Sequence, residues 1–228
     1  ALEVLNKMGL ISVVPVSVRN ALEEGMAGWR RETLKEDSKI LENSHAFIIG
    51  DNLKALYAAK AEARASGLQT VILTSSDAGE ARQVASSYLE KIRNLSHKVK
   101  KEGRAFCFLA GGELTVTVKG SGRGGRNTEF VLACLLEMEK IRDELAGCEW
   151  LIASLASDGR DGPTDSAGAW INGESSQLVA RAGLNPQNFL DNNDSYSFFE
   201  KIGGLIFTGP TGTNIMDLRF FLIVPAEK

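Results

Sequence analysis

Four polar segments that contain glycine combine charged and hydroxyl side chains at spacings that can do chemistry. They are residues 111–113, 120–127, 157–165 and 208–214. Each segment follows an apolar run or opens a helical pattern, and ligands of α/β proteins gather where strands end. Guanidinium groups beside glycine favour anion binding, whereas clustered carboxylates favour a metal ion or a substrate hydroxyl.

The second segment, residues 120–127, reads GSGRGGRN and carries Arg123 and Arg126 at the start of a predicted helix. Three of its glycines formally satisfy the dinucleotide pattern G-x-G-x-x-G. A dinucleotide site is disfavoured, because the preceding run alternates in hydropathy and the loop holds two cations. A compact polyanion such as a phosphate chain fits better, since an arginine here opposes the helix dipole unless an anion or a carboxylate compensates it. The alternative is a flexible turn with exposed arginines.

The third segment, residues 157–165, reads SDGRDGPTD and contains Asp158, Asp161 and Asp165. Three aspartates in a short loop at the end of a strand can hold Mg²⁺ and position a substrate hydroxyl. The spacing does not fit an EF-hand. The alternative is a surface loop in which aspartate side chains accept hydrogen bonds from nearby backbone N–H groups.

The first and fourth segments offer glycine with a few polar side chains. Gly111 and Gly112 allow close approach of backbone to a ligand, and Glu113 can bind a metal or a hydroxyl; a tight turn with a solvated glutamate is the alternative. Residues 208–214, TGPTGTN, can present N–H and O–H donors to an anion, but they lack the lysine of a P-loop. Between the last two segments, Asp194 or Ser195 is expected to cap a helix.

The elements that must position these loops alternate between apolar strands and amphipathic helices. Continuous apolar runs predict buried strands at residues 46–50, 70–73, 105–109, 150–156 and 219–224. Shorter strands are expected near residues 167–171 and 205–208, and helices near 52–66, 81–99, 126–140, 175–182 and 195–201. Residues 115–119 alternate with period two and predict a strand with one wet face. This alternation predicts an α/β fold with a mostly parallel sheet and covering helices, followed by a mixed-sheet α/β region.

The composition is that of an ordinary globular protein. The 228 residues are 43% hydrophobic and 24% charged, with a net charge of -3 that gives no basic footprint for nucleic acid. No apolar run approaches the length needed to cross a bilayer. The three cysteines are far apart, and Cys107 and Cys134 lie in apolar runs, so we expect buried free thiols in a reducing, cytoplasmic setting.

The motifs together resemble the glycerate kinases whose C-terminal half is called the MOFRL domain. The resemblance rests on LAGGE at 109–113, GRGGRNTE at 122–129, DGRDGPTD at 158–165, NDS at 193–195 and TGPTGTN at 208–214. Thr128 and Ser157 depart from the family's commoner Gln and Thr. We therefore expect residues 1–103 to end an N-terminal nucleotide-fold region and residues 104–228 to form a MOFRL-like domain.

The resemblance implies ATP-dependent phosphorylation of D-glycerate to 2-phosphoglycerate or 3-phosphoglycerate, with Mg²⁺ as cofactor. It implies catalytic roles for Arg126, Asp158 and Asp161, the two aspartates also holding the metal. Phosphate or substrate contacts are implied for Gly111, Gly112, Glu113, Gly122, Gly124, Gly125, Asn127, Asp194, Gly212, Thr213 and Asn214. Neither nucleic acid nor membrane is an expected partner, and a homo-oligomer stays open.

Two alternatives remain beside the kinase. One is a hydroxypyruvate reductase that uses NAD(P)H, and the other is a non-catalytic anion-binding domain. Members of the family are about twice as long, and their other half carries a lysine important for catalysis. Since the sequence opens inside an apolar helical pattern, we expect a fragment whose partner is the missing N-terminal half and which is inactive alone.

Overall fold

The computed structural model describes residues 1–31 and 33–226. Contacts divide the chain into two units, Ala1–Ile48 and Ile49–Lys228. The boundary expected after residue 103 does not coincide with this division. One strand and two helices that precede residue 103 belong to the second unit, where the strand is part of the one sheet and both helices pack against it.

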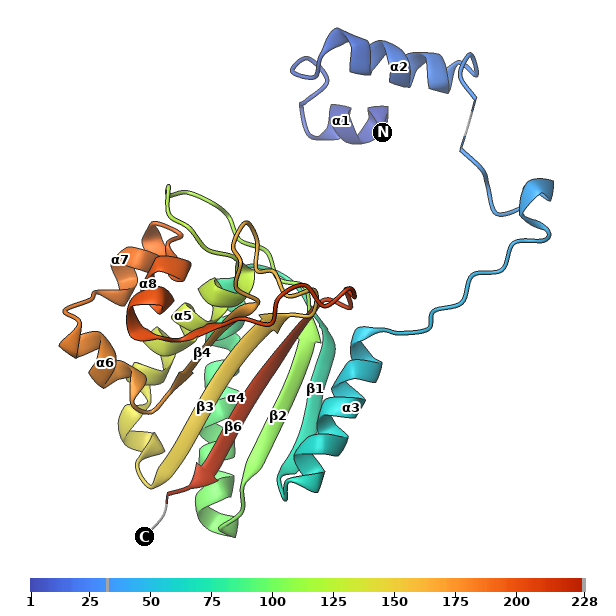
Figure 1. Cartoon of the computed structure of the whole chain (residues 1–228). Helices are drawn as coiled ribbons and strands as arrows, with labels where there is room; N and C mark the ends of the chain where they lie inside the picture. Colours follow the sequence, from blue (N-terminus) through green and yellow to red (C-terminus); the bar gives the residue numbers. More distant parts are fainter. Residues whose placement is uncertain (32, 227–228) are drawn as a thin grey trace. The chain divides into compact units, whose positions relative to one another are not determined.

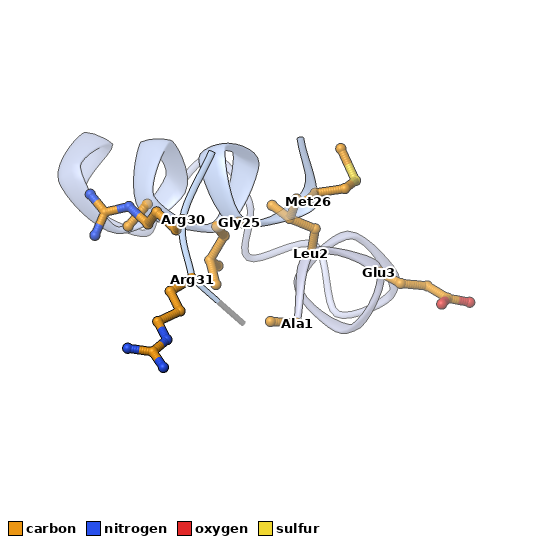
Figure 2. A pocket seen from close by; sticks show the side chains of 9 residues that line it. Ala1, Leu2, Glu3, Gly25, Met26, Arg30 and Arg31 are labelled. Atoms are coloured by element: carbon orange, nitrogen blue, oxygen red, sulfur yellow. The ribbon is translucent and has the colours of Figure 1, made fainter. Parts of the chain in front are cut away.

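The first unit contains α1 (Leu2–Lys7), α2 (Val16–Met26) and the short 3₁₀ helix η1 (Lys39–Leu41). Gly9 adopts a positive φ after α1, and Pro15 is the N-cap residue of α2. The helices of this unit bury no residue. A cavity of about 480 Å³ lies between α1 and α2, and Figure 2 shows the side chains around it. None of the motif residues lines this cavity, so we do not regard it as the functional site.

The strand predicted at residues 46–50 is wrong. The structure has no strand there, and the side chains of Phe47, Ile48 and Ile49 are 82%, 80% and 91% exposed. An apolar run becomes a buried strand only where a sheet supplies hydrogen bonds and covers its faces. The sheet of the second unit begins instead with the next apolar run.

The second unit is a sheet covered by helices. Its strands are β1 (Gln69–Asp77), β2 (Phe106–Gly112), β3 (Cys148–Ala156), β4 (Gly168–Asn172), β5 (Leu205–Ile206) and β6 (Asp217–Pro225). Its helices are α3 (Asn52–Ala65), α4 (Ala81–Glu102), α5 (Arg126–Lys140), η2 (Arg142–Leu145), α6 (Ser175–Arg181), α7 (Pro186–Asp191) and α8 (Ser195–Ile202). The expected helices and the remaining apolar strands are thus confirmed, and α7 is an addition.

The six strands pair in the order β1-β2-β6-β3-β4-β5, so the α/β fold with a mixed sheet is confirmed. The pairing is less parallel than expected, because among the described neighbouring strands only β1 and β2 form a parallel pair. The last strand, β6, enters between β2 and β3 in the opposite direction. Crossover helices predict parallel neighbours, but they do not reveal where a C-terminal strand will insert.

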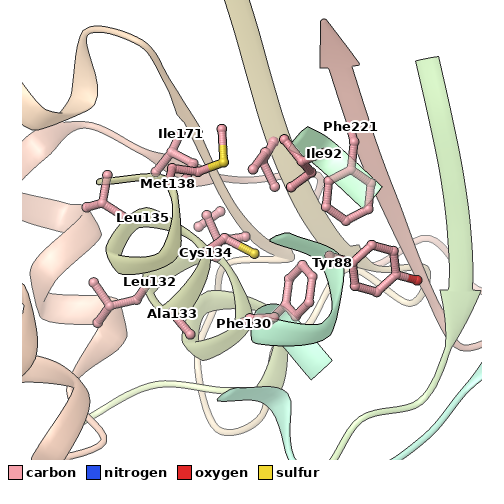
Figure 3. Packing of buried hydrophobic residues seen from close by; sticks show 14 of the residues in the cluster. Tyr88, Ile92, Phe130, Leu132, Ala133, Cys134, Leu135, Met138, Ile171 and Phe221 are labelled. Atoms are coloured by element: carbon pink, nitrogen blue, oxygen red, sulfur yellow. The ribbon is translucent and has the colours of Figure 1, made fainter. Parts of the chain in front are cut away.

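The two faces of the sheet are covered by different helices (Figure 1). On β6, Phe221 and Ile223 point into the main core beneath α4 and α5, whereas Phe220 and Leu222 pack with α3. Figure 3 shows the centre of the main core, where the ring of Tyr88 stacks on Phe221 at 4.7 Å between centroids. Phe130 meets both rings edge-on. This aromatic cluster fixes α4, α5 and β6 relative to one another.

The alternating segment at residues 115–119 forms no strand beyond a single bridge between Thr115 and Glu80. Side chains take the place of a partner strand. Glu80 accepts hydrogen bonds from the backbone N–H and the hydroxyl of Thr117, and Asn193 accepts one from the N–H of Lys119. The period of two therefore marks neither a ladder nor a buried face, since Val116 is half-buried and Val118 is 71% exposed.

Cys107 and Cys134 are buried free thiols, as expected, and burial raises the pKa of Cys107 to about 11. Cys148 is also free and half-buried. Within residues 1–31 and 33–226, none of the helices combines the length and the apolar character that a bilayer crossing requires.

Candidate functional site

The four polar segments meet at one edge of the sheet, at the end of the molecule where the loops gather in Figure 1. Asp217, the first residue of β6, pairs with Gly112 at the end of β2 and with Ala156 at the end of β3. The register therefore brings the segments after β2 and β3 beside the segment before β6. Helix α5 begins at the same edge, because its Arg126 contacts Asp217.

Asp161 caps the N-terminus of α5. Its carboxylate is fully buried and accepts hydrogen bonds from the backbone N–H groups of Asn127 and Thr128, both at 2.8 Å. The side chains of the same two residues also donate to it. Burial raises the pKa of Asp161, and these hydrogen bonds oppose the rise. Four donors occupy the carboxylate, so the geometry gives Asp161 a structural task that its spacing did not indicate.

Asn127, expected to contact phosphate, is buried in the same network. Its side-chain nitrogen donates to Asp161, and its side-chain oxygen accepts a 2.5 Å hydrogen bond from the hydroxyl of Ser154 on β3. All of its polar side-chain atoms are therefore engaged inside the protein. Asn127 ties the start of α5 to the sheet.

The glycine-rich loop packs against the segment around Asp194. The side chain of Asp194 accepts from the N–H of Arg123, and Asn193 accepts from the N–H groups of Lys119 and Gly120. Two further N–H groups of this loop, at residues 121 and 122, donate to the side chain and backbone of residue 192. Most donors that were expected to cradle a phosphate thus hold the loop in place.

The glycines of the loop also have a packing reason. A Cβ atom on Gly122 would lie 2.3 Å from the Cβ of Asp194, and one on Gly124 would lie 2.3 Å from the hydroxyl of Ser195. A Cβ on Gly125 would collide with Asp161. Close approach of protein to protein is sufficient to explain glycine at these positions.

Arg126 is held in a fork by Asp217. Its Nε and Nη2 donate to the two carboxylate oxygens at 2.7 and 2.9 Å, and the carboxylate is fully buried. The hydrogen bonds to Asp217 raise the pKa of Arg126, so its positive charge is secure. The remaining nitrogen, Nη1, lies 3.2 Å from Glu113, which is 55% exposed. The outer edge of the guanidinium is therefore the part that a ligand can reach.

Backbone donors lie beside this guanidinium. In the described part of the chain, the N–H groups of Gly124 and Arg126 have no hydrogen-bond partner. Gly124 and Arg126 line a cavity of about 350 Å³, which is also lined by Leu114, Val116 and Pro163. Two N–H groups at a helix N-terminus and a fixed guanidinium form a suitable anion site.

Arg123 does not join this site. Its guanidinium stacks on the ring of Tyr196 at 4.0 Å and lies 3.2 Å from Asp165. The hydroxyl of Tyr196 donates to the same carboxylate at 2.8 Å. The two arginines of the loop thus have different roles, although the sequence places them in similar surroundings.

The third and fourth segments are joined to each other. The hydroxyl of Thr211 donates to the backbone oxygen of Ser157, and the hydroxyl of Ser157 accepts from the N–H of Ile215. Asp158 is half-buried in this contact and accepts from the N–H of Arg160 at 2.9 Å and from Asn214 at 3.4 Å. Gly212 and Thr213 are exposed at the tip of the loop and contact neither Arg126 nor its cavity.

The carboxylates fit a metal ion only in part. Among residues 1–31 and 33–226, no group of three or more His, Cys, Asp or Glu residues is placed to hold one. The carboxylate of Asp161 is filled by four donors. Asp158 retains accepting capacity and fits Mg²⁺ as a single carboxylate, the usual arrangement when phosphates and water supply the other ligands.

Three residues at this edge carried too little sequence signal to be predicted as parts of the site. Asn52, the first residue of α3, is buried and donates to the backbone oxygens of Ile215 and Asp217, while Asp51 caps the helix. Gly111 lies against its side chain, since a Cβ there would meet Asn52 at 1.9 Å. Gly112 has a φ of +131° and lies against the backbone of residue 77. Asp217 lies just before the strand predicted at residues 219–224, and Arg219 is the first residue of that strand, so neither was recognised as part of the site.

Comparison with known proteins gives a consistent result. A model of the MOFRL family matches residues 106–217. The chain is 36% identical to the glycerate 2-kinase of Pyrococcus horikoshii, over 92% of this chain and 46% of that protein. It is 35% identical to the D-glycerate 2-kinase of Thermotoga maritima, over 98% and 49%. The crystal structure of glycerate kinase from Thermotoga maritima superimposes with a TM-score of 0.74, covering 98% of this chain and 50% of that one. The chain thus spans about half the length of these relatives.

The cap by Asp161 makes the first prediction. Asp161→Asn should lower the melting temperature, because an amide cannot accept from all four donors and each unpaired buried donor costs about 1–3 kcal/mol. Asp158→Asn is the matched control and should change the melting temperature little, since Asp158 is half-buried with two weaker contacts. Thermal unfolding of the chain without ligand, followed by circular dichroism, measures both. Equal melting temperatures for the two variants would contradict the cap.

The contact between Glu113 and Arg126 makes the second prediction. An incoming anion must displace this carboxylate, so Glu113→Gln should tighten binding of inorganic pyrophosphate by roughly twofold to fivefold, the size of an exposed ion pair. Titration calorimetry at low ionic strength measures the dissociation constant. Weaker binding by the variant would mean that Glu113 supports the ligand, for example through a metal ion.

Proposed function

We propose that the chain, whose residues 106–217 match a model of the MOFRL family and which is similar to glycerate kinases over most of its length, forms one wall of the active site of an ATP-dependent D-glycerate kinase. The product would be 2-phosphoglycerate or 3-phosphoglycerate. The observation that carries the proposal is the fixed guanidinium of Arg126 beside the unpartnered N–H groups of Gly124 and Arg126. Phosphoryl transfer depends on such oriented positive groups.

In this proposal Arg126 binds the anionic group of a substrate, either a phosphate of ATP or the carboxylate of glycerate. Asp217 keeps the guanidinium plane fixed, so little conformational freedom is lost when the anion binds. The N–H groups of Gly124 and Arg126 orient the same anion. Glu113 occupies the outer edge of the guanidinium until the anion replaces it.

Asp158 is the proposed carboxylate for Mg²⁺. The ion, when bound, would neutralise charge on the phosphate oxygens of the nucleotide. The N–H of Arg160 and the side chain of Asn214 donate to the Asp158 carboxylate and restrict its orientation. Asp161 acts indirectly, because the start of α5, and with it Arg126, depends on its cap.

The other two candidates find less support in the site. A reductase would need a nicotinamide site at the glycine-rich loop, whose N–H groups are mostly engaged by residues 192–194. A non-catalytic anion-binding domain would share the anion site and differ only in lacking turnover. Only D-glycerate-dependent turnover separates the kinase from this domain, whereas NADH oxidation with hydroxypyruvate separates the kinase from the reductase.

The anion site is tested by a matched pair of arginine variants. Arg126→Lys should weaken pyrophosphate binding by about tenfold or more, because a planar fork becomes a point charge and loses its bond geometry. Arg123→Lys should change the dissociation constant by less than about threefold, since Arg123 is stacked on Tyr196 and paired with Asp165. Equal effects of the two substitutions, or no binding by the wild type, would contradict the proposed site.

The reaction is tested by following ADP release with ATP, Mg²⁺ and D-glycerate, and NADH oxidation with hydroxypyruvate. We expect these 228 residues to bind polyphosphate without D-glycerate-dependent ADP release, because one wall of a cleft neither aligns two substrates nor excludes water. Turnover with D-glycerate would support the kinase and contradict the expected need for a second wall. NADH oxidation would overturn the kinase in favour of the reductase.

A further inference from the structure

Arg219 is a buried cation that the proposed anion site does not use directly. It lies on β6 between Ala110 of β2 and Ser154 of β3, and its side chain is fully buried. Burial lowers the pKa of Arg219, while the carboxylates of Asp217 and Asp77 oppose this effect. An arginine stays protonated even when buried, so a full charge lies inside the core.

The guanidinium of Arg219 is poorly satisfied by hydrogen bonds. Nη1 donates to Asp77 at 3.3 Å, whereas Nε and Nη2 have no hydrogen-bond partner in the described structure. Its plane also faces the ring of Phe130 at 5.3 Å. One hydrogen bond does not explain why a cation is buried here. Stability does not explain it either, because apolar residues of similar volume often replace a buried ion pair without loss of stability.

Arg219 lies between two carboxylates, that of fully buried Asp217 and that of half-buried Asp77. Its Nη2 lies 3.6 Å from Oδ2 of Asp217, the same oxygen that accepts the 2.7 Å hydrogen bond from Nε of Arg126. Asp217 is thus flanked by a cation from the core and a cation from the site. On the far side, Asp77 receives the hydroxyl of Tyr88 at 2.5 Å and is satisfied without Arg126.

We propose that Arg219 is a positioning residue for the anion site: its charge holds the carboxylate of Asp217, and through it the guanidinium plane of Arg126. The functional part of this inference rests on the proposed role of Arg126 in binding phosphate. Because Arg219 makes no hydrogen bond to Asp217, the interaction is one of charge. A lysine should therefore replace Arg219 in this role, and an uncharged side chain should not.

The test reads the state of Arg126 directly. In a ¹H–¹⁵N spectrum of the whole chain, the Nε–H signal of Arg126 is identified as the one lost in Arg126→Lys. The wild type and Arg219→Lys should show this signal slowly exchanging with water, because it is bonded to buried Asp217. In Arg219→Gln the exchange rate should rise by about tenfold or more, and pyrophosphate binding should weaken by about tenfold. An unchanged signal and unchanged binding in Arg219→Gln would overturn the proposal.

Two controls separate positioning from a general loss of structure. Tyr88→Phe removes a hydrogen bond from the far end of the same buried group and should leave the Arg126 signal unchanged. If Arg219→Gln does not fold, the double variant Arg219→Gln, Asp77→Asn removes both members of that ion pair and serves in its place. Retention of the slow signal in a folded double variant, or its loss in Tyr88→Phe, would overturn the proposal.

The measurements distinguish a failure of this inference from a failure of the proposed function. A wild-type chain that shows the slow Arg126 signal but binds no pyrophosphate contradicts the anion site and leaves the link from Arg219 to Arg126 intact. A chain that binds pyrophosphate equally well with Gln at 219 supports the anion site and contradicts that link.

Discussion

The carboxylate of Asp217 is fully buried where β6 begins, and a charge removed from water is tolerated only beside compensating charges and donors. Arg126 supplies two hydrogen bonds from the site side, and Arg219 supplies a second positive charge from the core. Asn52 holds the backbone oxygen of Asp217 from α3. Helix α5, helix α3 and strand β6 are therefore held together at one residue, Asp217.

This arrangement gives Arg126 two different sides. On the inner side, the guanidinium is paired with buried Asp217. On the outer side it contacts Glu113, whose side chain is 55% exposed, and the Arg126 side chain as a whole is 23% exposed. A guanidinium that is oriented before a ligand arrives binds an anion at a lower entropic cost. The buried ion pair thus acts on the anion site by orientation, whatever it contributes to stability.

The glycine-rich loop shows how one pattern can have two physical causes. Glycine allows backbone to approach a phosphate, but it allows equally close approach to another segment of protein. Here Gly122, Gly124 and Gly125 meet residues 161 and 194–195 at distances that leave no room for a Cβ atom. The carboxylate that compensates the helix start is Asp161 of the protein itself. What remains for a ligand is smaller than the motif suggested: two N–H groups and the edge of one arginine.

The sequence by itself determined the local features of this protein. Apolar runs located β1, β2, β3 and β6, helical spacing located α4 and α5, and the order of the polar motifs indicated the family. These features depend on neighbours along the chain, which the sequence displays. The same local rules predicted a strand at residues 46–50 that the structure lacks.

Only the tertiary structure decided which motif residues reach a ligand. The antiparallel insertion of β6 placed Asp217 against Gly112 and Ala156, and so converted Arg126 into a fixed group while Arg123 turned to Tyr196. It also engaged Asp161 and Asn127 in hydrogen bonds inside the protein, whereas the resemblance implied a catalytic role for Asp161 and a ligand contact for Asn127. The reason is that a polar side chain is available for chemistry only if the fold leaves its atoms unpaired, and its partners lie up to 165 residues away in sequence.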